Sequence, residues 1–413
     1  MTATLETPAA VESVEDFRQR ARAWLSAHAS ERGTSAEPSW GVGRFDVSVF
    51  HDLTEDEERS HLDAIVRWHQ TKCDAGFGAL SWPVEQGGAG LSPAHVEAFH
   101  EEELRFDVPG GHELFDVTLA LIAPTVAMFG TPEQQARFLP AFLRADELAC
   151  QLFSEPGAGS DLAALSTRAV RDGDDWVVTG QKVWTSGAQF AGWGELIART
   201  DATAAKHAGL TAFLLPLDSP GVTVRPLRQM SGGSSFNEVF LDEVRIPDSL
   251  RLGPEGAGWK VTLATLGFER GGGGAPRKIG GGYRELLDLA RWLGRDTDPI
   301  VRQRLAEVYA HERVGELSAA RADAERRPGQ PPGPEGSVKK LHWVAGMSMV
   351  SEVAALLLGP RLAADTGEWG TYDWTAHLLG APGYRIAGGS DEIQRNILAE
   401  RVLGMPAEPR PGR

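Results

Sequence analysis

Cysteine is scarce in this sequence of 413 residues, which holds only Cys73 and Cys150, far apart and outside any CxxC arrangement. Two such cysteines supply neither a disulfide framework nor a zinc knuckle, and they suit a reducing cytoplasm. Basic charge is also in deficit, because 41 Lys and Arg stand against 57 Asp and Glu, a formal net charge of −16. Such a surface repels a phosphate backbone, so we expect no nucleic-acid partner.

Long hydrophobic runs and a basic leader are absent as well. The first sixteen residues carry four acidic side chains and no basic segment before an apolar run, so no secretory signal is expected. The longest apolar candidate, residues 119–129, is interrupted by Pro124 and falls short of the ~18 to 20 residues of a membrane span. We therefore expect a soluble, cytoplasmic protein with no membrane partner.

Familiar nucleotide and metal signatures are missing too. Gly157-Ala158-Gly159 lacks the third glycine of a dinucleotide fingerprint, and no P-loop occurs. His95 and His100 are five residues apart, so they do not share a helix face as zinc ligands would. The sequence thus predicts no metal site.

The periodicity of apolar residues divides the chain into three parts. Helical spacing dominates residues 1–150, short strand-like runs recur about every 12 residues over 151–250, and helical spacing returns over 251–413. We predict an α+β fold with a helical N-terminal domain, a central β-barrel or sandwich, and a C-terminal helical-bundle domain with these boundaries.

Two runs in the middle of the chain are candidates for ligand binding. In residues 151–161, a proline and two glycines fix a tight loop whose N–H groups can converge on a ligand, although a plain turn explains the run equally well. In residues 181–187, Trp184 precedes two hydroxyl residues, an arrangement that suits the face of a flat heteroaromatic cofactor. A Trp in a strand is more often part of the core, so both interpretations stay open.

These two runs, together with residues 236–247 and the terminal run 388–395, resemble the acyl-CoA dehydrogenase family. The four motifs occur in the family's order over nearly the whole chain. The resemblance implies a C-terminal four-helix domain, with FAD in the crevice between it and the β-domain of a homotetramer or dimer. It also implies an acyl-CoA or acyl-carrier-protein thioester as substrate and an electron-transfer flavoprotein as electron acceptor.

The resemblance carries specific roles onto residues of this chain. It implies that cofactor contacts come from Gln151, Phe153, Ser154, Trp184, Ser186, Ser390 and Glu392. It implies that substrate contacts come from Gly159, Ser160, Arg270 and Gly388. In the implied reaction a base removes the proton α to the thioester carbonyl while the β-hydrogen leaves as hydride, which produces a 2,3-enoyl thioester.

The base does not occupy the family's most familiar position, which is Gly388 here. A second family position, found in isovaleryl- and long-chain-type members, aligns with Glu269, which is therefore the candidate base. Its alternative role is a helix-surface glutamate beside Arg270. The glycines that follow at 271–274 have two explanations: they open space beside the base for a bulky acyl group, or they only break the helix.

Two family motifs that reach a neighbouring subunit's FAD are altered, at residues 290–294 and 356–360. Such changes are similar to those of heteromeric relatives, in which two different chains build one FAD site. A half-site partner subunit is therefore one alternative to the dehydrogenase. A flavin-dependent monooxygenase on the same fold is another, and Glu269 argues against it because such enzymes lack the α-proton base.

Overall fold

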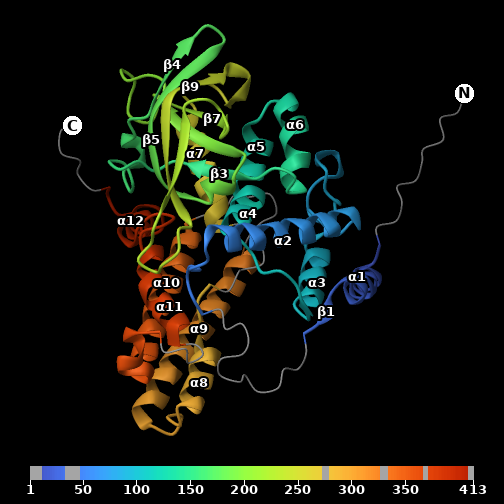
Figure 1. Cartoon of the computed structure of the whole chain (residues 1–413), viewed down its shortest axis with the longest axis vertical. Coiled ribbons are helices and arrows are strands. Elements are labelled where there is room, and N and C mark those ends of the chain that lie inside the picture. Colours follow the sequence, from blue (N-terminus) through green and yellow to red (C-terminus); the bar gives the residue numbers. More distant parts are fainter. Residues whose placement is uncertain (1–11, 33–46, 272–278, 326–333, 366–370, 408–413) are drawn as a thin grey trace, which may run out of the picture.

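The computed structural model describes residues 12–32, 47–271, 279–325, 334–365 and 371–407. Within these ranges helices are followed by strands and then by helices, and this order confirms the predicted α+β fold class (Figure 1).

The N-terminal part is helical. Its first elements are α1 (Val14–His28), α2 (Glu55–Asp74), α3 (Pro93–Glu103) and α4 (Glu113–Val117), followed by the π-helical turn η2 (Thr118–Ile122), α5 (Ala123–Phe129) and α6 (Pro132–Leu143). Two short strands, β1 (Ser30–Glu31) and β2 (Phe106–Asp107), pair with each other. Capping boxes start α2 at Thr54 and α6 at Thr131, because each hydroxyl accepts a backbone N–H that the helix leaves unpaired.

The central part forms a sheet of eight strands within the described residues. They are β3 (Ala149–Leu152), β4 (Arg168–Asp172), β5 (Asp175–Ser186), β6 (Trp193–Arg199), β7 (Leu210–Pro216), β8 (Val222–Leu227), β9 (Phe236–Pro247) and β10 (Arg251–Leu252). The strand order is β10-β7-β6-β4-β5-β9-β8, and β3 pairs in parallel with β6. Most pairs are antiparallel. The register of β5 against β9 shifts between Lys182 and Thr185, which interrupts the ladder at the second candidate run.

The C-terminal part comprises α7 (Gly258–Gly271), α8 (Tyr283–Trp292), α9 (Pro299–Glu325), α10 (Glu335–Leu358), α11 (Thr371–Tyr384) and α12 (Asp391–Arg401). Helix α7 contacts β6 and β7 of the sheet, η2 and α5 of the N-terminal part, and α10. One apolar core therefore runs from the N-terminal helices through β6 and β7 to Val261 of α7. The remaining helices bury a separate core around Leu286, Val350 and Trp374.

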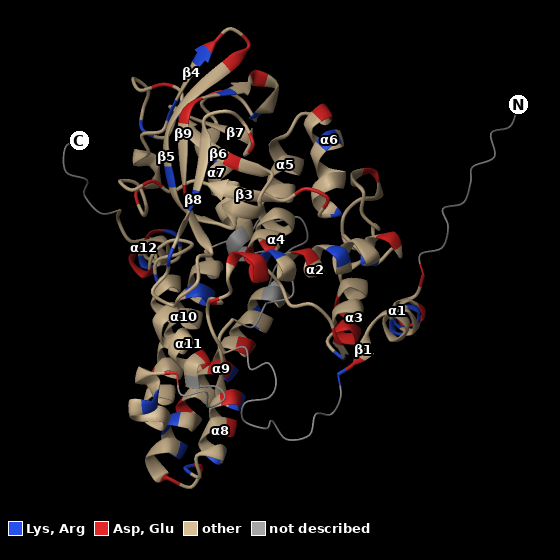
Figure 2. Cartoon of the chain, in the orientation of Figure 1, with Lys and Arg blue, Asp and Glu red and all other residues tan. Residues whose placement is uncertain are grey.

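One stretch, Gly336–Ala363, is long and apolar enough by length and composition to cross a membrane. It includes most of α10, which contacts α8, α9, α11 and α12. Figure 2 shows mostly uncharged residues where α10 and α11 lie side by side. Of the most apolar window of this stretch, 39% is buried within the fold.

Candidate functional site

A buried lysine joins the two candidate runs. Lys182 of β5 is fully buried, and its Nζ lies 3.0 Å from the carbonyl oxygen of Phe153 and 2.8 Å from Oε1 of Glu155. The backbone N–H of Val183 also donates to the carbonyl of Ser154 at 2.9 Å. The structure thus brings together two runs that are separate in the sequence.

The carboxylate of Glu155 is the anchor of this junction. Its two oxygens also accept hydrogen bonds from the backbone N–H groups of Ser166 and Thr167 and from the Ser166 hydroxyl. Burial raises the pKa of Glu155, but the attraction of Lys182 and these hydrogen bonds outweigh it and lower the pKa to about 2. Burial lowers the pKa of Lys182 to about 8, and the adjacent carboxylate partly opposes that shift. Neither residue stands out in the sequence as a site residue, although both lie inside the candidate runs.

Trp184 points away from the core. Its side chain is 62% exposed, and its backbone has φ of +61°, a conformation uncommon for a residue with a side chain. The ring meets Phe236 of β9 edge to face, with centroids 6.2 Å apart. The alternative of a core tryptophan is therefore wrong, because the register shift in β5 turns this residue outward.

Each of the two candidate runs contains a buried polar atom that has no hydrogen-bond partner in the described part of the chain. The Nε2 of Gln151 and the Oγ1 of Thr185 are buried and have no hydrogen-bond partner among the described residues. Phe153 is 6% exposed, and Ser154 and Ser186 are half-buried. Buried polar groups without partners are uncommon in folded proteins. The exposed Trp184 ring and the half-buried hydroxyls of Ser154 and Ser186 are groups that can contact a flat heteroaromatic cofactor with polar edges, so these residues suit a bound flavin.

The outer part of the first loop is open. Gly159 and Ser160 are exposed, and a Cβ added at Gly159 would meet no atom within 4 Å. The loop closes on itself between Glu155 and Ala158, which exchange two backbone hydrogen bonds. Nothing in these contacts obstructs a ligand at Gly159 and Ser160, and their role in substrate binding stays a prediction.

The terminal motif makes its contacts mainly within the C-terminal part. Gly388 and Gly389 have φ of +63° and +91°, and their carbonyls accept hydrogen bonds from Nε2 of Gln394 at 2.9 and 3.2 Å. The ammonium of Lys340 on α10 also contacts the carbonyls of Ala387 and Gly389.

The two cofactor candidates of this motif differ in their surroundings. Ser390 caps α12 by accepting the backbone N–H of Ile393. Glu392 is exposed, and its Oε1 lies 3.6 Å from Nη1 of Arg395. Their contact with a cofactor stays a prediction.

Glu269 and Arg270 lie on the last turn of α7, and their side chains are outside the described residues. The glycines at 272–274 are outside them too. What the structure establishes is the setting of their helix, which lies between the sheet and α5. The base assignment for Glu269 therefore stays a prediction.

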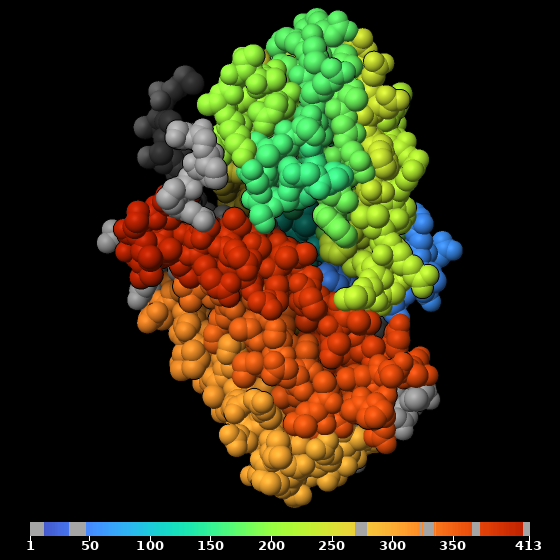
Figure 3. Space-filling model, turned by 90° about the vertical axis from the view of Figure 1, so that its left-hand side faces the viewer, coloured from blue at the N-terminus to red at the C-terminus, as the bar shows by residue number. Residues whose placement is uncertain are grey.

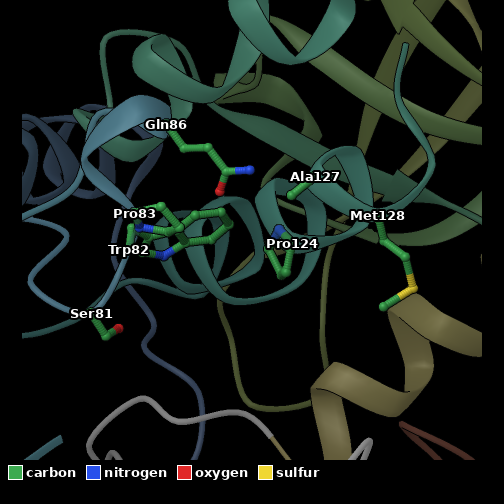
Figure 4. Close-up of a pocket in the computed structure, with 7 residues that line it drawn as sticks. All are labelled: Ser81, Trp82, Pro83, Gln86, Pro124, Ala127 and Met128. Atoms are coloured by element: carbon green, nitrogen blue, oxygen red, sulfur yellow. The ribbon is translucent and has the colours of Figure 1, made fainter. Parts of the chain in front are cut away.

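Figure 3 shows the central sheet meeting the C-terminal helices, with a hollow at their boundary. A separate cavity of about 370 Å³ lies between α5 and the loop that carries Trp82 and Pro83. Figure 4 shows Pro124, Ala127 and Met128 of α5 on the opposite side from that loop. This cavity is mainly apolar and contains no residue that the sequence predicts for the site.

A helical N-terminal part, a β-sheet with an exposed tryptophan and a C-terminal group of helices match the architecture of a flavin-dependent dehydrogenase. Three family models match the chain in order: the acyl-CoA dehydrogenase N-terminal domain over residues 48–146, the middle domain over 150–244 and the C-terminal domain over 256–403. The chain belongs to the acyl-CoA dehydrogenase family. It is an oxidoreductase acting on CH–CH bonds, and FAD is its cofactor.

Relatives and solved structures agree with this assignment. Acyl-CoA dehydrogenase IpdE1 of Mycobacterium tuberculosis is 41% identical over 404 residues, which cover 96% of this chain and 99% of the relative. The ChsE4-ChsE5 complex of the same organism contains a similar chain at 28% identity and a TM-score of 0.73, covering 99% and 100% of the two chains. The Tcur3481-Tcur3483 steroid acyl-CoA dehydrogenase has one at 26% identity and a TM-score of 0.73, covering 98% and 100%.

Proposed function

We propose that this chain catalyses the α,β-dehydrogenation of an acyl-CoA thioester to the 2,3-enoyl-CoA, in the cytoplasm, with an electron-transfer flavoprotein as acceptor. The observation that carries the proposal is the junction of the two candidate runs by Lys182 and Glu155, next to the exposed Trp184 in the second run. When bound, FAD supplies the hydride acceptor. The chain's own residues position the cofactor and remove the α-proton.

In this proposal Glu269 is the base. It lies on a helix that is packed on both sides, a support that limits the movement of a catalytic group. A positioned general base contributes about 10²- to 10⁴-fold to the rate. The backbone of the loop at Gly159 and Ser160 is proposed to hold the thioester's carrier, for which CoA and an acyl carrier protein are the two candidates.

We further propose a bulky, ring-bearing acyl group as substrate. The name of one similar solved structure specifies a steroid enzyme, and the glycines that follow Glu269 in the sequence leave room for a wide substrate if they continue its helix. This substrate class is a refinement of the dehydrogenase proposal.

The assembly is proposed to include a second, different chain. Two of the similar structures are named as pairs of gene products. The altered segments at 290–294 and 356–360 include Trp292 and Leu356, which are 42% and 38% exposed. Exposed apolar residues in a segment that departs from the family motif suit an unlike partner better than a second copy. A homotetramer or dimer is the alternative.

Purification and reduction test this proposal together. The protein is produced alone and, in parallel, with the product of a neighbouring dehydrogenase gene, and each preparation is mixed anaerobically with short, branched, long and polycyclic acyl-CoAs. We expect a yellow protein whose flavin bleaches fastest with the polycyclic thioesters. Protein that stays colourless alone but becomes yellow with its partner is a half-site subunit. Flavin that is reduced only by NAD(P)H and then consumes oxygen identifies a monooxygenase.

A further inference from the structure

A carboxyl group outside the candidate runs lies at the meeting point of all three parts of the fold. Glu195 of β6 is fully buried, and its Oε1 is 2.8 Å from the hydroxyl of Thr265 on α7. That hydroxyl is 3.0 Å from the hydroxyl of Thr125 on α5, which lies 2.7 Å from the carbonyl of Leu121. Four residues thus form a hydrogen-bonded chain from the sheet through α7 to the N-terminal helices.

The protons in this chain can be counted. Thr125 has one hydroxyl proton, and the backbone carbonyl of Leu121 can only accept it. The single hydroxyl proton of Thr265 has three acceptors within reach: Oε1 of Glu195 at 2.8 Å, the hydroxyl of Thr125 at 3.0 Å and the carbonyl of Val261 at 3.2 Å. A protonated Glu195 can itself donate to Thr265 and so leaves the Thr265 proton for Thr125 or Val261, whereas an ionised Glu195 can only accept that proton. An ionised Glu195 draws the Thr265 proton to itself and leaves Thr125 without its donor.

The surroundings of Glu195 favour the neutral acid. Its register partners on the adjacent strands are Gln151 of β3 and Leu214 of β7, and both are uncharged. Burial raises the pKa of Glu195 to about 8, which the hydrogen bond from Thr265 only partly opposes. Its other oxygen, Oε2, is buried and has no partner among the described residues.

Among the described side chains of β6, β7, α5 and α7, the other charged groups are engaged elsewhere. Strand β7 and helix α5 contain no acidic or basic side chain. On α7, Lys260 lies over the ring of Phe129, with its Nζ 5.9 Å from the ring centroid. At the end of β6, Arg199 donates to the carbonyls of Leu165 and Ala163. No described cation is therefore placed to hold Glu195 in its charged form.

Thr265 lies one helical turn before Glu269, so the two residues share a face of α7. We propose that Glu195 is a positioning residue which, as a neutral acid, anchors α7 through Thr265 and Thr125 and so holds Glu269 in place for proton removal. This inference rests on the proposed role of Glu269 as the base. Its consequence is a dependence of the reaction on the proton of a residue that is not the base.

The first test follows anaerobic flavin reduction by acyl-CoA from pH 6 to pH 9.5. In the unaltered protein we expect the rate to fall at least about tenfold above pH 8, because a displaced base loses its alignment. Glu195→Gln keeps a neutral donor to Thr265 at every pH, so its rate should stay within about threefold across that range. The same alkaline fall in Glu195→Gln overturns the proposal.

Two threonine variants serve as matched controls. Thr265→Val interrupts the chain without adding or removing a charge, so we expect a lower kcat at pH 7 with little change in KM and no fall above pH 8. Thr265→Ser restores the hydroxyl and should restore both the rate and its pH dependence. A Thr265→Val protein with unchanged kcat overturns the positioning role.

The second test uses unfolding and needs no activity. The pKa of Glu195 is raised by folding, so its contribution to stability is fully present below about pH 4.5 and is lost as pH rises through about 8. The melting temperature of the unaltered protein should therefore fall more steeply between pH 5 and pH 8 than that of Glu195→Gln. If the melting temperature depends on pH in the same way in both proteins, Glu195 is not a buried neutral acid.

Glu269→Gln separates failure of this inference from failure of the proposed function. If Glu269→Gln keeps normal flavin reduction, Glu269 is not the base and the proposed mechanism is wrong. If Glu269→Gln is inactive while Glu195→Gln retains the alkaline fall, only the positioning role of Glu195 is overturned.

Discussion

Lys182 and Glu155 form an ion pair in the interior of the β-domain, with Nζ and Oε1 2.8 Å apart and side-chain exposures of 0% and 4%. The same ammonium holds the carbonyl of Phe153, so one residue fixes the loop and the strand that flank the candidate flavin site. A pair removed from water in this way is costly to separate, because the remaining charge has no solvent to stabilise it.

Lys182→Met should destabilise the protein by about 3–5 kcal/mol and reduce the amount of flavin that it retains, because it leaves the buried Glu155 without its cation. Urea unfolding and flavin absorbance measure the two effects. The double variant Lys182→Met with Glu155→Gln, which leaves no unpaired charge, should recover much of the lost stability. If it does not, the pair is not the source of the effect.

The acid stability of the same junction follows from the lowered pKa of Glu155, about 2. A carboxyl group whose pKa is lowered by folding contributes stability that is present above about pH 4.5 and is lost as pH falls through about 2. Glu155→Gln should therefore be less stable than the unaltered protein at pH 6 and approach it near pH 2. Denaturant midpoints measured across that range provide the comparison, and a constant difference would contradict the assignment.

Trp184→Ala should leave the free energy of unfolding within about 0.5 kcal/mol of the unaltered value, because the side chain is 62% exposed. It should weaken flavin retention or shift the flavin spectrum, since a ring contact is lost. Trp176→Ala is the control, because Trp176 is 2% exposed and its loss should cost about 3–5 kcal/mol. Full flavin content with an unchanged spectrum in Trp184→Ala would remove Trp184 from the site.

Glu269→Gln should preserve folding and flavin content and slow single-turnover flavin reduction by about 10²- to 10⁴-fold, the contribution of a positioned base. Glu255→Gln, which changes an exposed glutamate just before the same helix, should leave the reduction rate unchanged. Near-normal reduction in Glu269→Gln would eliminate it as the base.

Gly388→Glu places a carboxyl group at the family's other base position, but we expect it not to rescue Glu269→Gln. Gly388 has φ of +63°, a conformation that costs a residue with a side chain about 1–2 kcal/mol. Its carbonyl is also held by Gln394. Flavin reduction by the double variant measures the outcome, and substantial recovery would show that the two base positions are interchangeable here.

Local sequence patterns were sufficient for the order of the secondary structure and for the family. The shift from helical to strand spacing and the four motifs are each written in consecutive residues. They were not sufficient for the orientation of Trp184. That orientation depends on a register shift between β5 and β9, whose paired residues are about fifty positions apart in the chain.

The tertiary structure alone decided which charges are paired and which carboxyl group stays neutral. Glu155 finds Lys182 across 27 positions, whereas Glu195 reaches Thr265 across 70, and Thr265 reaches Thr125 across 140. Both glutamates are buried, yet one lies beside an ammonium and the other beside hydroxyls, so their pKa values move in opposite directions. The protonation state of a carboxyl group depends on what surrounds it in space, and residues distant in sequence determine those surroundings.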